Sequence, residues 1–269
     1  MIYQKVVLIT GGSTGIGYAI GAYLHDKGFR VVGTSRTPAN YPNPLFQLLK
    51  MDVKDGQSIQ NVINQVIADY GVIDVLINNA GVGITGPLEE LPETEIKANF
   101  ETNFFGPIAV MKAVLPSMRQ QKSGLIINIT SIAGYMGLPY RSIYSATKGA
   151  LELITESLRM EVKPFGILIT NVAPGDFATN IASNRYHAPV QKGSAYEASY
   201  GKSVSLLNQH VDSGSNPLQM AEAVYAIIQT KQPKIHYKVG SLMQKFSVVL
   251  KRILPDKLFE RLLMNHYKL

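Results

Sequence analysis

The sequence of 269 residues contains no cysteine. Without thiols the chain cannot form disulfides, thiolate metal sites or a cysteine nucleophile. The absence of cysteine is typical of proteins in a reducing compartment, so we expect a cytoplasmic location. An apolar run of about 18 residues, as a membrane-spanning helix needs, is also missing. The first five residues lead directly into the apolar segment 6–9, so we expect no signal peptide.

Charged residues are few, and their distribution is uneven. They make up 17% of the chain, with a net charge of +7. Residues 231–269 hold nine basic and two acidic residues, whereas residues 1–230 hold 17 of each. The balanced body argues against nucleic-acid binding by the fold itself. The five histidines are scattered, and no cluster with acidic residues indicates a metal site.

Short, continuous apolar runs alternate with helical periodicity along the chain, with no internal repeat or low-complexity tract. Strands are expected at 6–9, 30–34, 46–51, 73–77, 125–129, 167–172 and 235–239, and helices at 15–27, 55–70, 93–119, 142–163 and 217–230. Continuous apolar strands are typical of a parallel sheet that is covered on both faces. We therefore predict an α/β fold: a single doubly wound parallel-sheet Rossmann domain over residues 1–239, with about seven strands and helices on both faces.

Two segments fall outside this alternation. Residues 177–215 are polar and rich in Gly, Ser and Tyr, which predicts a substrate loop or lid. Residues 240–269 predict an amphipathic helical extension that packs on the domain or on a partner subunit. Its two apolar stripes are separated near Pro255 and comprise Leu242, Phe246, Val249, Leu250 and Ile253, then Leu258, Phe259, Leu262 and Leu263. Peripheral membrane contact through 241–269 remains an alternative.

A glycine-rich turn lies between the first strand and the first helix, with the spacing T-G-x-x-x-G-x-G over residues 10–17. Glycines in this position let backbone N–H groups approach a pyrophosphate at a helix N-terminus. The turn predicts dinucleotide binding, although an ordinary glycine-rich loop is the alternative. A P-loop NTPase is excluded, because no Gly-Lys-Ser/Thr follows. The binding candidates are Gly11, Ser13, Thr14, Gly15, Ile16 and Gly17.

The end of the second predicted strand distinguishes the two nicotinamide cofactors. An NAD site needs an acidic residue about 20 residues after the glycines, to bond the ribose 2′-hydroxyl. No Asp or Glu occurs between Asp26 and Asp52, and the strand ends in Ser35-Arg36. An arginine suits a 2′-phosphate, so we predict NADP(H) rather than NAD(H). A solvated surface arginine is the alternative.

Tyr144 and Lys148 are one helical turn apart, so both side chains can share one face. The pair is weak by itself, because Tyr23 and Lys27 have the same spacing. Its context is stronger, since Tyr144 follows the fifth predicted strand, and doubly wound sheets bind ligands at the carboxyl ends of strands.

The order of these motifs resembles that of the short-chain dehydrogenase/reductase family. The matching elements are the glycine turn, Asp52-Val53, Asn78-Asn79-Ala80-Gly81, Asn103, Ser131, Tyr144 with Lys148, and Pro174-Gly175 with Thr179. Residues 237–240 and the Leu-rich tail are loosely similar to the hydroxysteroid/retinol-dehydrogenase-like branch. The resemblance covers most of residues 1–239.

The resemblance implies a catalytic role for four residues. Tyr144 would act as general acid, or as base in the reverse direction. Lys148 would favour the phenolate by its charge and hold the nicotinamide ribose. Ser131 would bond the substrate carbonyl oxygen, and Asn103 would anchor a water-linked proton relay.

The same resemblance implies the cofactor contacts. Asp52 and Val53 would meet the adenine. The adenosine ribose and diphosphate would lie against Asn79, Ala80 and Gly81, and the nicotinamide side against Pro174, Gly175, Phe177 and Thr179.

The substrate side is less defined. The candidates are Gly83, Tyr135, Tyr140 and Tyr186. No arginine cluster is evident, which favours an apolar or aromatic alcohol or ketone. We expect an NADP(H)-dependent oxidoreductase that transfers hydride between nicotinamide and such a small molecule, as a homodimer or homotetramer. The alternatives are a catalytically inactive dinucleotide-binding regulator and a membrane-surface dehydrogenase of lipid, retinoid or steroid type.

Overall fold

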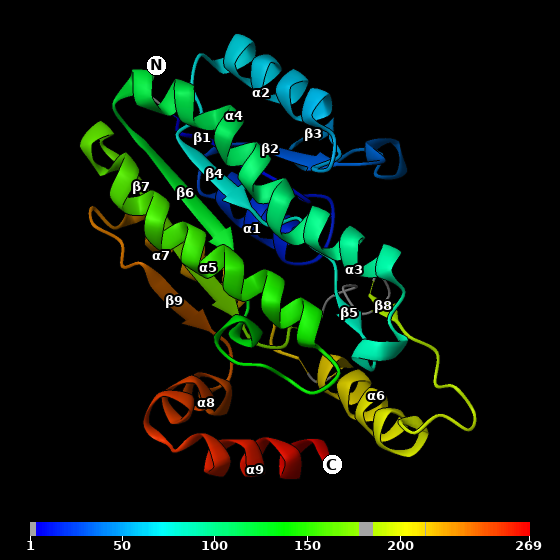
Figure 1. Ribbon diagram of the computed structural model, residues 1–269. Helices are drawn as coiled ribbons and strands as arrows, with labels where there is room; N and C mark the ends of the chain where they lie inside the picture. Colours follow the sequence, from blue (N-terminus) through cyan, green and yellow to red (C-terminus); the bar gives the residue numbers. More distant parts are fainter. Residues whose placement is uncertain (1–3, 178–184, 213) are drawn as a thin grey trace.

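The computed structural model describes residues 4–177, 185–212 and 214–269. Its main sheet has seven parallel strands in the order β3-β2-β1-β4-β6-β7-β9 (Figure 1). The strands are β1 (Val6–Ile9), β2 (Arg30–Ser35), β3 (Gln47–Lys50), β4 (Val75–Asn78), β6 (Gly124–Ile129), β7 (Ile167–Pro174) and β9 (His236–Val239). The predicted doubly wound α/β fold is confirmed.

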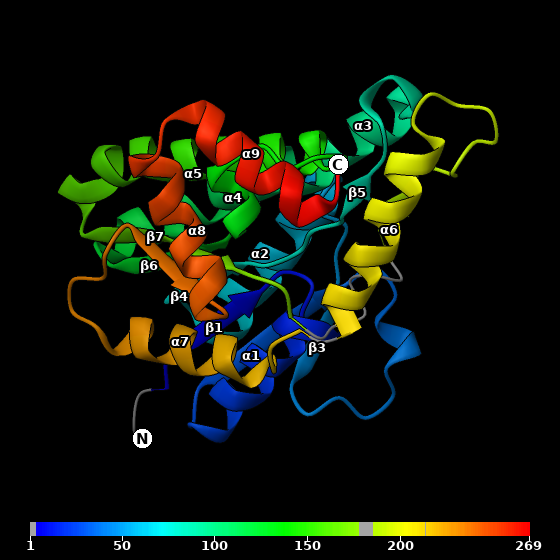
Figure 2. The ribbon, with the colours of Figure 1, turned by 90° about the horizontal axis from the view of Figure 1, so that it is seen from below.

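Helices cover both faces of this sheet. One face carries α2 (Gly56–Tyr70), α4 (Gly106–Gln121) and α5 (Ser142–Val162), and the other carries α1 (Gly15–Asp26) and α7 (Leu218–Gln229) (Figure 2). Successive side chains of a strand point to opposite faces. In β1, Leu8 therefore joins one hydrophobic core, whereas Val7 and Ile9 join the other. Two covered faces explain why the interior strands β1, β4 and β6 are almost continuously apolar.

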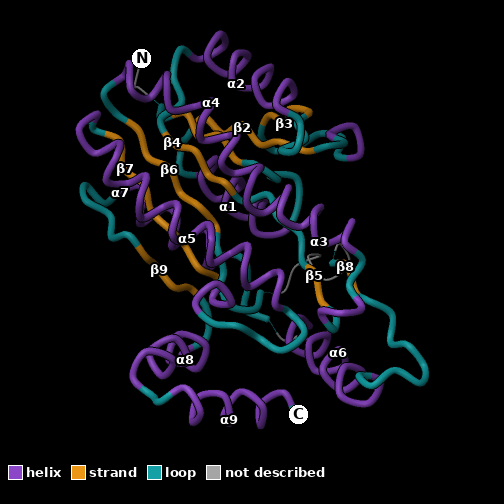
Figure 3. The backbone as a smooth tube through the Cα atoms, in the orientation of Figure 1, coloured by secondary structure: helices purple, strands orange, loops and turns teal. Residues whose placement is uncertain are grey.

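The helix expected over 93–119 has an internal irregularity. It consists of α3 (Glu93–Phe100), a π-helical turn (Glu101–Phe105) and α4. The smooth tube in Figure 3 shows α3 leading directly into α4. A π turn inserts one residue into a helix and is frequent at functional sites; this one contains Asn103.

The segment 177–215 was expected to be a loop, but its described part contains regular structure. Strand β8 (Tyr186–His187) pairs in parallel with β5 (Ile84–Thr85), and α6 (Glu197–Asp212) follows. Tyr200 anchors α6: its side chain is buried, and its hydroxyl donates to the carbonyl oxygens of Thr85 and Ala188. The helix therefore depends on contacts far away in the sequence.

The C-terminal extension forms α8 (Leu242–Ile253) and α9 (Asp256–Tyr267), which lie beyond the carboxyl ends of the strands (Figure 1). Ser241 and Gln244 form a capping box at the start of α8, which satisfies N–H groups of its first turn. Val248, Phe259 and Tyr267 are buried, whereas the first predicted stripe remains largely exposed in the single chain. Over the described ranges, no helix combines the length and apolar character that crossing a bilayer requires.

Candidate active site

The glycine turn is held closed by Thr10 and Asn79. The Thr10 hydroxyl accepts from the backbone N–H groups of Asn79 and Ala80 at 3.0 and 2.9 Å. The Asn79 amide donates to the carbonyl oxygens of Thr10 and Gly11, both at 3.0 Å. These bonds join the carboxyl ends of β1 and β4, so the turn has a fixed shape.

At two positions in this turn the backbone geometry favours glycine. Gly11 has a φ of 66°, in the left-handed region that L side chains rarely adopt. A Cβ on Gly17 would collide with the Gly11 carbonyl oxygen and the Asn79 amide. Thr14 precedes α1 without a side-chain capping bond, so the first N–H groups of the helix suit a phosphate. Around them Ile16 is buried, Ser13 and Gly15 are half-buried, and Thr14 is exposed.

The residues that were predicted to select the cofactor and to meet the adenine lie at the carboxyl ends of β2 and β3. Arg36 directly follows β2, is exposed, and makes no hydrogen bond or ion pair within the described part of the chain. Beneath it, the Ser35 hydroxyl accepts from the N–H of Thr37 at 3.2 Å. Asp52 is half-buried and accepts from the N–H of Lys54 at 3.0 Å, and the neighbouring Val53 is buried.

Ser131, Tyr144 and Lys148 come together where β6 and α5 meet. The Ser131 hydroxyl oxygen accepts from the N–H of Ala133 at 3.1 Å. The buried Lys148 Nζ donates to the Ile129 carbonyl oxygen at 3.0 Å and lies 5.9 Å from the Tyr144 ring centre. Burial lowers the pKa of Lys148, and the charges of Tyr144 and Glu152 oppose that shift.

Asn103 is fully buried in the π turn. Its side-chain oxygen accepts from the N–H of Val82, and its amide donates to the Val82 carbonyl oxygen, both at 2.8 Å. The segment after β4 is thus fixed to the α3–α4 helix. Gly81 lies inside this junction, because a Cβ there would stand 3.1 Å from Asn103 Oδ1 and 3.4 Å from Lys148 Nζ.

A buried polar network that sequence reasoning did not find lies one turn beyond Lys148. Glu152 is 5% exposed. Its carboxylate accepts from Thr130, from Tyr135 at 3.1 Å and from Asn171 at 2.8 Å, and it pairs with His236 Nδ1 at 2.7 Å. His236 Nε2 also meets Glu156 at 3.0 Å. Burial and the Glu152 charge raise the pKa of Tyr135, so its phenol is a fixed donor to the carboxylate.

A cavity of about 550 Å³ at the carboxyl ends of the strands brings the predicted groups together. Its lining contains residues of the glycine turn, the catalytic set and the nicotinamide set, namely Ile16, Ser131, Tyr144, Pro174, Gly175 and Phe177. Its outer wall is largely apolar and includes Leu250 of α8 and Leu262 of α9. The predicted contact Thr179 lies outside the described residues.

Two arginines that sequence reasoning missed also line this cavity. The guanidinium of Arg141 is centred 5.1 Å from the Tyr144 ring centre. Arg185 packs over Gly83, and its buried Nη1 atom has no hydrogen-bond partner among the residues that the structure describes. Burial and the nearby Arg141 lower the pKa of Arg185, whereas Tyr144 and Asp176 oppose the shift. Sequence reasoning found no sign of an arginine cluster for a highly anionic substrate, and the fold places these two arginines in the cavity lining together with Asp176.

The four predicted substrate residues do not line this cavity. The hydroxyl of Tyr135 points to Glu152, and that of Tyr140 donates to Ser199 at 2.8 Å. Gly83 lies beneath Arg185 and accepts from the N–H of Tyr186, the first residue of β8, at 3.1 Å. Gly83 and Tyr140 therefore bond to the segment 185–212, and Tyr135 bonds to the buried Glu152.

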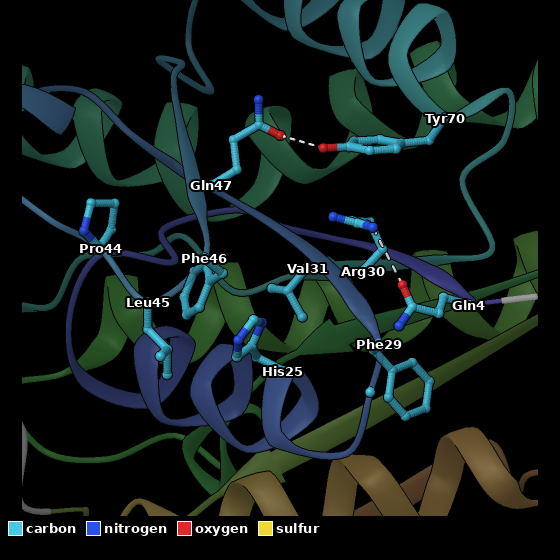
Figure 4. Close-up of a pocket in the computed structure, with 11 residues that line it drawn as sticks. Gln4, His25, Phe29, Arg30, Val31, Pro44, Leu45, Phe46, Gln47 and Tyr70 are labelled. Atoms are coloured by element: carbon cyan, nitrogen blue, oxygen red, sulfur yellow. Dashed lines mark hydrogen bonds between the residues drawn. The ribbon is translucent and has the colours of Figure 1, made fainter. Parts of the chain in front are cut away.

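A second cavity, of about 400 Å³, lies at the opposite end of β2 and β3 (Figure 4). Four of its polar side chains bond to one another: Arg30 donates to Gln4 at 3.4 Å, and the Tyr70 hydroxyl donates to Gln47 at 2.9 Å. The predicted catalytic residues are not among its lining residues.

Comparison with known proteins identifies one family. The family model described as short chain dehydrogenase matches residues 5–199. The chain is 39% identical over 264 residues to a 3-ketodihydrosphingosine reductase of Bacteroides thetaiotaomicron, with 98% of each chain covered. A short-chain dehydrogenase structure from Streptomyces avermitilis has a TM-score of 0.82 at 33% identity, covering 99% of this chain and 97% of that chain. An alcohol dehydrogenase from Thermococcus sibiricus, complexed with 5-hydroxy-NADP, has a TM-score of 0.72 at 25% identity and covers 89% and 97%.

Proposed function

Because this chain belongs to the short-chain dehydrogenase/reductase family of dinucleotide-dependent oxidoreductases, we propose that it uses NADPH to reduce a ketone attached to a long apolar chain. The observation that carries the proposal is the cavity of about 550 Å³ in which Ser131 and Tyr144 stand beside an apolar wall. The glycine turn, with the open N-terminus of α1 and no room for a Cβ at Gly17, fits a dinucleotide.

The bound nicotinamide would supply the hydride, and the chain's own residues would orient and protonate the carbonyl oxygen of the substrate. Because the Ser131 oxygen already accepts from Ala133, its hydroxyl proton is available to the substrate carbonyl oxygen. That bond orients the carbonyl and strengthens as negative charge develops. Tyr144 then donates its proton to the same oxygen. The adjacent Lys148 cation favours the phenolate that results.

The exposed Arg36 supports a preference for NADPH. It directly follows β2 and makes no hydrogen bond or ion pair with the described residues. Its guanidinium is therefore available for a 2′-phosphate. The strand end offers no carboxylate for the 2′-hydroxyl of NAD.

The lining of the cavity supports an amphipathic substrate. Arg141, Arg185 and Asp176 form a polar end beside Tyr144, and apolar residues of α8 and α9 form the far wall. The Bacteroides thetaiotaomicron relative is named for a keto lipid. We therefore favour a long-chain ketone whose head carries hydrogen-bonding oxygens, and reduction as the physiological direction.

A series of ketones with growing chains tests this function through NADPH oxidation, followed by absorbance. Each methylene that enters the cavity contributes about 0.8 kcal/mol, so kcat/KM should rise about fourfold per methylene until the cavity is filled. Tyr144→Phe should lose turnover but bind NADPH with an unchanged Kd. An active Tyr144→Phe enzyme would contradict the mechanism. A wild-type enzyme that binds NADPH but reduces no ketone in the series would instead favour the regulator.

A further inference from the structure

Helix α8 directs most of its large apolar side chains to solvent. Leu242, Phe246, Val249 and Ile253 are spaced on one helical face and are 83%, 56%, 43% and 66% exposed. We call these four residues the outer stripe. The opposite face contributes Val248, which is 1% exposed, to a core cluster. The orientation is the reverse of that of a surface helix in a globular protein, whose apolar stripe faces the core.

Positive charge lies next to the outer stripe. Lys245 and Arg252 directly precede Phe246 and Ile253, and α8 contains no acidic residue. In α9, Asp256 is already paired with Lys251 at 2.8 Å, which leaves Glu260 as the other acidic residue of the extension. An apolar stripe with adjacent cationic side chains is the pattern of a helix that lies in a membrane interface.

The outer stripe lies beside the mouth of the active-site cavity. Met243 is 77% exposed and also lines the cavity, and Leu262 of α9 does the same at 44% exposed. The two helices therefore form both the outer apolar surface and the cavity wall. Figure 1 shows them together beyond the carboxyl ends of the strands.

We propose that the outer stripe docks on an anionic lipid bilayer, with α8 lying in the interface and the cavity mouth facing the lipid. Charge complementarity favours this occupant over a second copy of the chain. In a twofold contact, the segment 231–269, with nine basic and two acidic residues, would face an identical basic segment. An anionic bilayer offers the opposite charge, and its acyl region accepts the stripe.

Cosedimentation of the full chain with vesicles tests this proposal. The probes are vesicles of phosphatidylcholine alone and of an equal mixture with phosphatidylserine. The disrupting variant is Phe246→Glu/Ile253→Glu. The matched control is Leu153→Glu/Met160→Glu on α5, because these side chains are 67% and 71% exposed and have the same seven-residue spacing. A second variant, Lys245→Glu/Arg252→Glu, reverses the adjacent charge and leaves the stripe intact.

We expect the wild-type chain to bind the mixed vesicles and to bind less as salt is added. The stripe variant should bind at least tenfold more weakly, the α5 control like wild type, and the charge-reversal variant should lose the preference for phosphatidylserine. On a short water-soluble ketone the stripe variant should keep wild-type kcat/KM, which shows that it is folded.

Three results would overturn the proposal. The first is no vesicle binding by the wild type, and the second is equal loss of binding in the α5 control. The third is a wild-type dimer that becomes monomeric only in the stripe variant, because the outer stripe would then be a subunit interface. Vesicle binding is measured without substrate, so its failure leaves the proposed reductase activity intact.

Discussion

Neutralising Glu152 separates its structural role from its effect on Lys148. In Glu152→Gln the new amide can turn its NH₂ group toward Thr130, whose hydroxyl is able to accept. Its oxygen then remains for the donors of Tyr135, Asn171 and His236. The contacts survive, but bonds to a charged acceptor, worth about 1.5–3 kcal/mol each, become neutral ones worth about 0.5–1.5 kcal/mol. Allowing for partial relaxation, we expect a loss of about 1–3 kcal/mol in the free energy of unfolding, measured in urea.

The second consequence concerns catalysis. Burial lowers the pKa of Lys148, and Glu152 is one of two charges that oppose this shift. Removing a negative charge disfavours the ammonium, so the pKa of Lys148 should fall further. The cation beside Tyr144 is then lost at a lower pH. The alkaline limb of the kcat/KM profile should therefore move to lower pH in Glu152→Gln.

Glu156→Gln is the matched control. It lies one turn further along α5, meets the same histidine at 3.0 Å and is 45% exposed. We expect a loss of no more than about 1 kcal/mol, as for an exposed pair, and an unchanged alkaline limb. The reasoning is refuted if both variants have the same stability and pH profile, or if the limb in Glu152→Gln moves to higher pH.

Three further substitutions test the cofactor and substrate contacts. Gly17→Ala should weaken NADPH binding in a fluorescence titration and lower the free energy of unfolding by about 1–3 kcal/mol, because the new Cβ meets Gly11 and Asn79. Wild-type values in both assays would contradict the close approach of Gly17 to these two residues. Arg36→Ala should lower the NADPH/NADH ratio of kcat/KM about tenfold or more, since a charge-assisted bond is worth about 1.5–3 kcal/mol; an unchanged ratio would refute the assignment. Arg185→Met should reduce kcat/KM for ketones with oxygen-bearing heads, while plain alkyl ketones keep theirs. An equal loss on both would show that Arg185 only packs against Gly83.

The fold was predictable because its signals are local. Strands such as β1, β4 and β6 are short apolar runs buried on both faces, as Val7, Leu8 and Ile9 illustrate, and glycines or helical periodicity separate the runs. The π turn could not be predicted, because it depends on the pairing of Asn103 with the backbone of Val82, 21 residues earlier. Helix α6 could not be predicted for the same reason, because its Tyr200 is held by hydrogen bonds to the carbonyl oxygens of Thr85 and Ala188.

The site divides in the same way. Motif residues such as Ser131 and Tyr144 could be predicted from the order of the motifs along the chain, and both line the same cavity. The substrate end was not predictable from residue type. Tyrosines suggested a pocket wall, yet the hydroxyls of Tyr135 and Tyr140 are committed to Glu152 and Ser199. Arg141 and Arg185 belong to no motif. Arg141 is only three residues before Tyr144, but the fold is needed to bring Arg185 near both of them.

The C-terminal extension shows what periodicity leaves open. A repeat of apolar residues predicts that a helix has an apolar face, but not which way that face points. In α8 the buried contact is Val248, whereas the side chains that define the stripe are more than two-fifths exposed. A stripe of this kind persists in a stable fold only if something covers it at least part of the time, because exposed apolar patches favour association. Since the surrounding charge is positive and the cavity opens beside it, a bilayer would cover the stripe and deliver an apolar ketone through the same surface. Activity on a long-chain ketone embedded in anionic vesicles should therefore fall in Phe246→Glu/Ile253→Glu, while activity on a soluble ketone does not.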